Sequence, residues 1–265
     1  MDKQTYMISQ LTTLTGIPSP TGMTREITDY LLAELTRLGF TPERTPKGTV
    51  MCCLGGSGHP LVLSAHVDAL GAMVRSILPN GCLRYTQIGG YNDNAIENET
   101  VRIHTREGKV YTGTVQSVHT SSHVWGDITA EKRDDRSLQI VVDEMTWSKA
   151  ETEALGIRPG DFISLDPRTV VTPSGFIKSR HLDDKASSAV LLTLAREVAE
   201  GRVTLGRQTT VVFMRKWATA PPPCTRWTST IWWPWTWAAW ATTWPARKTW
   251  SPSAPRTAPG PTITT

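Results

Sequence analysis

Two short motifs carry side chains that could bind a divalent metal ion. His66 and Asp68 flank one valine at the end of an apolar segment, and Asp183-Asp184 lies in "RHLDDKASSAV", directly before a run of small residues. An imidazole nitrogen is a good ligand for zinc or cobalt, and a carboxylate two residues away can hold the second ring nitrogen and fix the tautomer. Each motif alone also has an ordinary explanation, because many such histidines are hydrogen-bonded core residues and adjacent acids often cap a helix.

The elements that must position these motifs are helices and buried strands. "TREITDYLLAELTRLGF" predicts an amphipathic helix that Gly39 ends. "GTVMCCLGG", "HPLVLSAHVDAL" and "QTTVVFM" predict strands, and the second is apolar enough to be buried on both faces by helices. "SGFIKSRHLDDKASSAVLLTLAREVAEG" predicts a turn that runs into a helix. The apolar face of the first helix consists of Ile27, Tyr30, Leu31, Leu35 and Leu38.

The segment between the two motifs has a different pattern. From Gly71 to Asp166, short alternating runs such as "ETVRIHTREGKVYTGTVQS" and "RSLQIVVDEM" are separated by glycine, which predicts a β-rich body. The expected fold class is therefore α/β: a layered α/β domain interrupted by a small, barrel-like β-rich domain, with an irregular C-terminal tail. The expected boundaries are 1–69 and 167–213 for the two parts of the α/β domain, 70–166 for the insert and 214–265 for the tail.

Four segments in sequence are more specific than either motif alone. Their order and spacing resemble the dinuclear-metal aminopeptidases of the glutamyl and deblocking aminopeptidase family, some of whose members carry endoglucanase names; the segments are "HVDALGAMV", "IGGYNDN", "SKAETEALGIRPGD" and "GFIKSRHLDDKASSAVLL". The similarity covers residues 4 to about 213. It implies two divalent metal ions (zinc, cobalt or manganese), with His66 as a ligand, Asp183 as the bridge and Asp68 as a catalytic residue that supports the site from behind. Ala69 departs from the family, where glutamate is common.

The resemblance also implies a reaction, the removal of N-terminal residues from peptides. Two neighbouring metal ions can polarise the scissile carbonyl and anchor the amino end of the substrate, while a glutamate passes a proton from water to the leaving amine. Relatives take this glutamate from a Glu-Glu pair directly after the strand that corresponds to "TTVVFM", where this chain has "RKWATAPPPC". A peptide substrate and a homo-oligomeric assembly are the partners that the resemblance implies.

The tryptophan-rich C-terminal segment, which includes "TIWWPWTWAAWATTWPARKTW", indicates a shifted reading frame. Tryptophan and methionine each have a single codon, so parts of the message can be inferred from the protein. Read from the third base of each codon, residues 214–217 give Glu-Glu-Val followed by glycine with permitted codons, which restores the missing pair. No Asp or Glu follows Glu200, and no leucine or valine follows Val212. We therefore expect a truncated, inactive product with a non-native tail.

Other functions remain open. Clustered tryptophan can bind sugars or lie at a membrane interface, but the prolines and the absence of helical or strand periodicity argue against an ordered module. The β-rich insert could mediate assembly in a non-catalytic, oligomerising remnant. A glycosidase-type hydrolase would need two carboxylates that flank a sugar cleft, whereas these motifs have the spacing of metal ligands.

Composition excludes several broader classes. The net charge is +4, and all 24 acidic residues lie at or before Glu200, so the positive excess comes from the C-terminal part of the chain. The sequence has no compact cluster of basic residues, so we expect no nucleic-acid partner. It also has no apolar run long enough to cross a bilayer, so we expect no membrane partner. The four cysteines have neither CxxC spacing nor a dense disulfide framework, which favours a reducing, cytoplasmic location.

Overall fold

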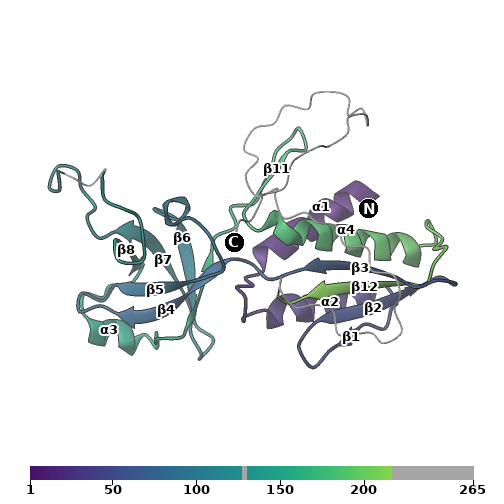
Figure 1. Ribbon diagram of the computed structural model, residues 1–265, viewed down its shortest axis with the longest axis horizontal. Helices are drawn as coiled ribbons and strands as arrows, with labels where there is room; N and C mark the ends of the chain where they lie inside the picture. The colour runs from purple at the N-terminus through teal and green to yellow at the C-terminus, as the bar shows by residue number, and fades with distance from the viewer. Residues whose placement is uncertain (127–129, 217–265) are drawn as a thin grey trace, which may run out of the picture. The chain divides into compact units, whose positions relative to one another are not determined.

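The computed structural model describes residues 1–126 and 130–216. Helices and a four-stranded sheet form an α/β part, and the segment inserted into it forms a closed barrel (Figure 1). The predicted irregular tail lies outside the described residues from position 217 onward. No helix among the described residues has both the length and the apolar content that a bilayer crossing requires.

The α/β part is built around a mixed sheet. Its elements are α1 (Lys3–Gly16), α2 (Arg25–Arg37), β1 (Glu43–Arg44), β2 (Val50–Gly55), β3 (Leu61–His66), α4 (Leu182–Ala199) and β12 (Thr209–Met214). The strand order is β1-β2-β12-β3, with β12 antiparallel to β2 and parallel to β3. Figure 1 shows α1 and α4 lying together along the sheet, where α4 packs on β3, whereas α2 contacts β2.

The predicted amphipathic helix is confirmed as α2. Ile27, Leu31 and Leu35 are fully buried in the core that α2 shares with the sheet. Gly39 follows the helix with a φ of 91°, a left-handed conformation that glycine adopts without strain. Phe213 of β12 is fully buried in the same core. Burial of each such side chain contributes roughly 1.5–3 kcal/mol, so this core holds in place the ends of β3 and α4, where the two motifs lie.

Strand β3 is less buried than its apolar sequence predicts. Leu61, Val62 and Leu63 are half-buried and Ser64 is exposed, whereas β12 is buried over nearly its whole length, as predicted. The prediction of a strand covered on both faces is therefore wrong for β3. The reason is its position, because within the described ranges β3 pairs only with β12 and stands at the edge of the sheet.

The β-rich segment closes into a barrel, and the structure confirms the predicted fold class. The barrel strands are β4 (Gly71–Ile77), β5 (Leu83–Ile88), β6 (Thr100–His104), β7 (Val110–Ser117), β8 (Leu138–Val142) and β9 (Phe162–Leu165), with the short helices η1 (Asp93–Ala95) and α3 (Lys149–Ala154) between them. The order is β4-β5-β8-β7-β6-β9, and β9 closes the ring by pairing with both β4 and β6. A separate apolar core that includes Leu83, Ile103 and Ile163 fills the interior.

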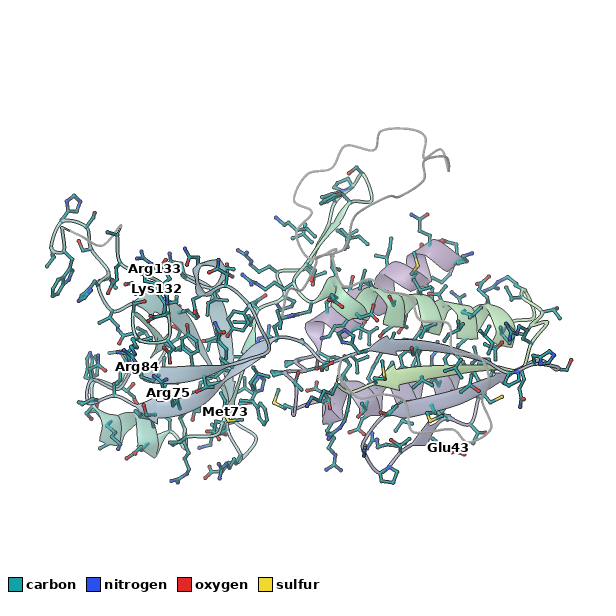
Figure 2. The ribbon with its side chains drawn as sticks, in the orientation of Figure 1. Glu43, Met73, Arg75, Arg84, Lys132 and Arg133 are labelled. Atoms are coloured by element: carbon teal, nitrogen blue, oxygen red, sulfur yellow. The ribbon has the colours of Figure 1, made fainter. Side chains whose placement is uncertain are left out.

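Two arginines hold the long connection between β7 and β8 against the barrel. Arg75 of β4 and Arg84 of β5 lie on neighbouring strands (Figure 2). Arg75 forms an ion pair with Asp135, and Arg84 donates a hydrogen bond of 2.9 Å to the backbone carbonyl of Leu138. These contacts anchor the end of the connection where β8 begins.

A hairpin leads from the barrel back to the α/β part. It consists of β10 (Val170–Val171) and β11 (Ile177–Lys178), which pair antiparallel. The turn that the sequence predicts before α4 is therefore a short β-hairpin, and Phe176 within it is exposed.

Candidate metal centre

The two motifs meet at one end of the parallel strand pair. β3 ends at His66, and the first turn of α4 contains Asp183 and Asp184, which are joined by a cis peptide bond. Nε2 of His66 lies 3.1 Å from Oδ1 of Asp183, and the backbone N–H of His66 donates to Oδ2 of Asp184 at 3.3 Å. The fold thus brings together side chains that are 117 positions apart in the chain. Their role as metal ligands remains a prediction.

Asp68 lies on the other side of the imidazole and is buried. Its Oδ1 is 3.0 Å from Nδ1 of His66, and its Oδ2 accepts a hydrogen bond of 2.5 Å from the hydroxyl of Thr21. The angles of this contact lie outside hydrogen-bond geometry, and within the described part of the chain neither Nδ1 nor Oδ1 has a hydrogen-bond partner, so each is the main polar neighbour of the other. This contact leaves Nε2 of His66 facing Asp183, where a cation could bind.

The neighbouring carboxylates decide the charge of His66. Burial alone lowers the pKa of its imidazole, but the hydrogen bonds to Asp183 and Asp68 outweigh burial and raise the pKa to about 9. In the metal-free chain, the imidazole of His66 therefore keeps its second proton near neutral pH. A divalent cation can replace such a proton, because it bonds to the same lone pairs and compensates the same negative charge.

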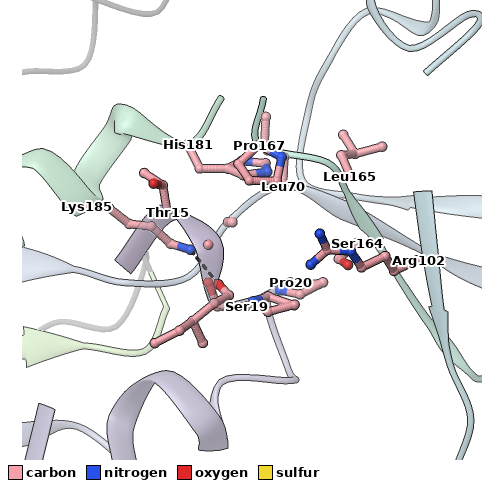
Figure 3. Close-up of a pocket in the computed structure, with 14 residues that line it drawn as sticks. Thr15, Ser19, Pro20, Leu70, Arg102, Ser164, Leu165, Pro167, His181 and Lys185 are labelled. Carbon is pink, nitrogen blue, oxygen red and sulfur yellow. Dashed lines mark hydrogen bonds between the residues drawn. The ribbon is translucent and has the colours of Figure 1, made fainter. Parts of the chain in front are cut away.

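Lys185, the residue after the acidic pair, carries a buried amine. Its side chain is fully buried, and its Nζ donates to the backbone carbonyl of Ile17 at 2.9 Å (Figure 3). Burial lowers the pKa of Lys185 to about 7, and the charge of Asp68 acts in the opposite direction. Lys185 and His181 both line one small cavity. The backbone of His181 is left-handed there, with a φ of 64°. Burial and then the charge of Lys185 lower the pKa of His181 to about 4, so its ring is neutral near neutral pH.

The side chains present fit part of a metal site. Nε2 of His66 and the carboxylate of Asp183, whose side chain is 58% exposed, offer the nitrogen and oxygen donors that zinc, cobalt and manganese accept. Among residues 1–126 and 130–216, no group of three or more His, Cys, Asp or Glu side chains has the arrangement of a complete site. The described residues can therefore contact a cation but supply fewer ligands than a closed coordination shell requires.

The structure brings the three sequence-predicted residues together and adds two that the sequence did not reveal. His66, Asp68 and Asp183 form one chain of contacts. Thr21 was missed because it lies 47 positions before Asp68, in a connection without a recognisable motif. Lys185 had a detectable signal, because a lysine between an acidic pair and a run of small and apolar residues is a candidate for a buried cation.

A family comparison decides how these features are related to known proteins. The model of the M42 glutamyl aminopeptidase family matches residues 48–215, more than half of the chain, and this range includes both motifs. The chain belongs to this family. The Bacillus subtilis (strain 168) protein YhfE, which carries an aminopeptidase name, is 46% identical to this M42 chain over 187 residues, covering 70% of the chain and 54% of YhfE. The chain spans about half the length of the curated relatives it matches, from 43% to 55%.

Solved structures share the fold of this M42 chain. An aminopeptidase from the archaeon Desulfurococcus kamchatkensis has a TM-score of 0.68 at 25% identity, with coverage of 80% of this chain and 56% of that chain. The Pyrococcus horikoshii TET1 peptidase, described as assembling into a tetrahedron or a large octahedral shell, has a TM-score of 0.66 at 22% identity, with coverage of 78% and 59%. At that identity, the second likeness concerns the fold alone.

Proposed function

We propose that this M42 chain derives from a two-metal aminopeptidase that removes N-terminal residues from peptides, and that the 265-residue chain itself is inactive, with a non-native segment after β12. The approach of His66 to Asp183 at 3.1 Å, with Asp68 on the other ring nitrogen, supports the first statement. The absence of any acidic residue after Glu200 in the sequence supports the second.

The residues of the site would divide the work of peptide hydrolysis. When bound, two divalent ions would supply Lewis-acid activation of the scissile carbonyl and attraction for the free amino end of the substrate. His66, through Nε2, and Asp183, through its carboxylate, would hold the ions. Asp68 contacts the imidazole rather than the reacting atoms. It would therefore be a positioning residue that, when an ion is bound, keeps the remaining ring proton on Nδ1 and leaves the lone pair of Nε2 to the ion.

The proton transfer is the step for which this chain has no suitable group at the expected place. The resemblance puts a Glu-Glu pair after the strand that matches β12, whereas Arg215 and Lys216 follow Met214 here. A missing general base lowers the rate roughly a hundredfold to ten-thousandfold. The frame-shifted reading restores the pair at this point, and we therefore propose that the coding sequence beyond β12 has left its original frame.

Assembly and location are proposed from the relatives and from the cysteines. The shells that the Pyrococcus horikoshii TET1 peptidase forms suggest that an intact form of this chain is a homo-oligomer that acts on peptides. The free thiols of Cys52, Cys53 and Cys82 suit a reducing, cytoplasmic location. Neither a nucleic acid nor a membrane is a proposed partner.

An activity comparison tests the proposed reaction. The 265-residue chain and a version in which the frame after Phe213 is restored are each purified and loaded with zinc, cobalt or manganese. We expect the restored protein to release leucine or glutamate from amino-acid anilides and to lose this activity with a chelator, while the present chain stays at the blank level. Chelator-sensitive turnover by the present chain would show that the assignment of the tail is wrong. Activity on cellulose, rather than on anilides, would favour a glycosidase-type hydrolase.

A non-catalytic role in assembly is the second candidate. The closed barrel favours it, because a body with its own apolar core can keep an interaction surface when the catalytic part is incomplete. The 265-residue chain with an affinity tag is co-expressed with the untagged, frame-restored chain, and the mixture is purified through the tag. Recovery of a stable mixed complex would support assembly, whereas recovery of the tagged chain alone would exclude it.

A further inference from the structure

The connection between α1 and α2 is tied to the segment that follows β3. Within residues 17–21, the hydroxyl of Ser19 donates to the backbone carbonyl of Val67 at 2.8 Å. The backbone of Ala69 donates to the carbonyl of Ser19 at 2.7 Å, and the backbone of Thr21 donates to the carbonyl of Ala69 at 3.2 Å. Pro20 and Ala69 form a parallel β-bridge. These bonds fix the backbone on both sides of Asp68.

Thr21 adds a side-chain contact to this backbone pairing. Its hydroxyl donates to Oδ2 of Asp68 at 2.5 Å, while Oδ1 of the same carboxylate faces Nδ1 of His66 at 3.0 Å. A carboxylate can rotate about its last torsion angle, which has a broad energy minimum. A hydrogen bond to one oxygen therefore sets the direction of the other. In this geometry, the Thr21 hydroxyl directs Oδ1 toward the imidazole.

The same connection also reaches the second motif. Lys185 follows the acidic pair directly, and its Nζ donates to the carbonyl of Ile17 at 2.9 Å (Figure 3). Ile17 stands at the end of α1 and belongs to the same short connection as Thr21. Residues 17–21 are thus bonded to the segment that carries His66 and to the segment that carries Asp183.

We propose that Thr21 is a positioning residue of the metal centre: its hydroxyl holds the Asp68 carboxylate so that Oδ1 stays against Nδ1 of His66 and Nε2 of His66 stays directed toward Asp183. This role rests on the proposed two-metal function, because it assigns His66 as a ligand. It extends that function to a residue outside both motifs. Loss of a group that orients a metal-binding histidine typically weakens metal affinity about 10-fold to 100-fold.

Two substitutions of Thr21 distinguish the effect of its hydroxyl from the effect of its side-chain shape. Thr21→Val keeps the branched shape and removes the donor, whereas Thr21→Ser keeps the donor. Thr36→Val is a matched control, because among the described residues the Thr36 hydroxyl bonds within its own helix alone, to the carbonyl of Leu32 at 2.8 Å. Each variant is made in the full 265-residue chain, and its thermal unfolding is compared with that of the parent.

Two readouts are measured on each folded variant. The first is zinc affinity by competition with a chromophoric chelator. The second is the Nδ1–H resonance of His66 in metal-free, ¹⁵N-labelled protein, because a buried ring proton that faces a carboxylate exchanges slowly with water. We expect Thr21→Val to lose about 10-fold to 100-fold in zinc affinity and to lose the protected ring proton. Thr21→Ser and Thr36→Val should retain both.

Several results would decide against this role of Thr21. Thr21→Val with the zinc affinity and the ring proton of the parent would overturn it, and so would equal losses in Thr21→Ser. If Thr21→Val does not fold, Thr21→Ala is measured in its place with the same expectations. If the parent chain binds no zinc, its incomplete ligand set explains that result without touching the proposed function of the intact form. The ring proton alone then decides whether Thr21 positions Asp68.

Discussion

The barrel and the α/β sheet differ in how their strands are bounded. Every barrel strand has a neighbour on both sides, since β9 pairs with β4 and with β6. In the sheet, by contrast, β3 pairs only with β12 among the described residues. A closed ring leaves no unpaired backbone row, whereas an open edge exposes N–H and C=O groups that can pair with another chain. The barrel is therefore structurally complete, while the sheet has a side on which an additional strand could pair.

Separate expression of the two parts should give the largest effect. Residues 70–166 alone are expected to give a monomer with a cooperative unfolding transition, because they contain a closed ring and an apolar core of their own. Residues 1–69 joined by a short linker to 167–216 are expected to aggregate through the open edge of β3. Size-exclusion chromatography and circular dichroism measure both outcomes. The same experiment tests the domain boundaries, which remain a prediction.

The opposite behaviour of either fragment would show that the barrel and the α/β part do not differ in their ability to fold alone. A 70–166 fragment without a cooperative transition would show that the barrel depends on the α/β part for its stability. A monomeric, stable α/β fragment would show that the edge of β3 is covered in solution.

A pair of core substitutions should give the next largest effect. Phe213 in the sheet and Ile163 in the barrel are both fully buried, and truncation of such residues to alanine costs about 2–5 kcal/mol. Because their apolar cores are separate clusters, Phe213→Ala should accelerate hydrogen exchange mainly in β2, β3 and β12, and Ile163→Ala mainly in the barrel strands. Mass spectrometry of exchanged peptides measures this. Equal acceleration in both parts by either substitution would indicate one cooperative unit.

Alkaline pH should weaken the α/β part more than the barrel. The pKa of His66 is about 9 in the folded, metal-free chain, above its ordinary value of 6.5. The folded state therefore binds this proton more tightly, and the resulting stability is complete below pH 6.5 and is lost as the pH rises through 9. The shift corresponds to about 3 kcal/mol. Urea unfolding between these pH values should show the loss, and His66→Asn should reduce it; an unchanged pH dependence in this variant would assign the loss to another group.

Local sequence pattern was sufficient to predict most elements of the fold. Apolar periodicity predicted α2, and alternation with glycine predicted a β-rich insert, because both signals arise from neighbouring residues. The exposure of β3 could not be predicted in this way, because it depends on which strands lie beside it. Closure of the barrel likewise depends on the pairing of β9 with β4 and β6, which no local pattern encodes.

In the candidate site, too, local motifs could be predicted from the sequence and long-range contacts could not. His66, Asp68 and Asp183 were found because each belongs to a short motif with a metal-type donor set, and the resemblance joined the motifs. Thr21 could not be found, because its function depends on one hydrogen bond between segments that are distant in the sequence. Orientation by long-range contacts of this kind has no sequence signature of its own.

The burial of Lys185 gives this lysine a distinct chemical reactivity. Surface amines react with acylating or reductive-methylating reagents in the native state, whereas Nζ of Lys185 is shielded from solvent and bonded to the carbonyl of Ile17. A reagent can reach it only when the start of α4 separates from the end of α1. Modification of this one amine is therefore a record of local opening where the start of α4 meets the end of α1.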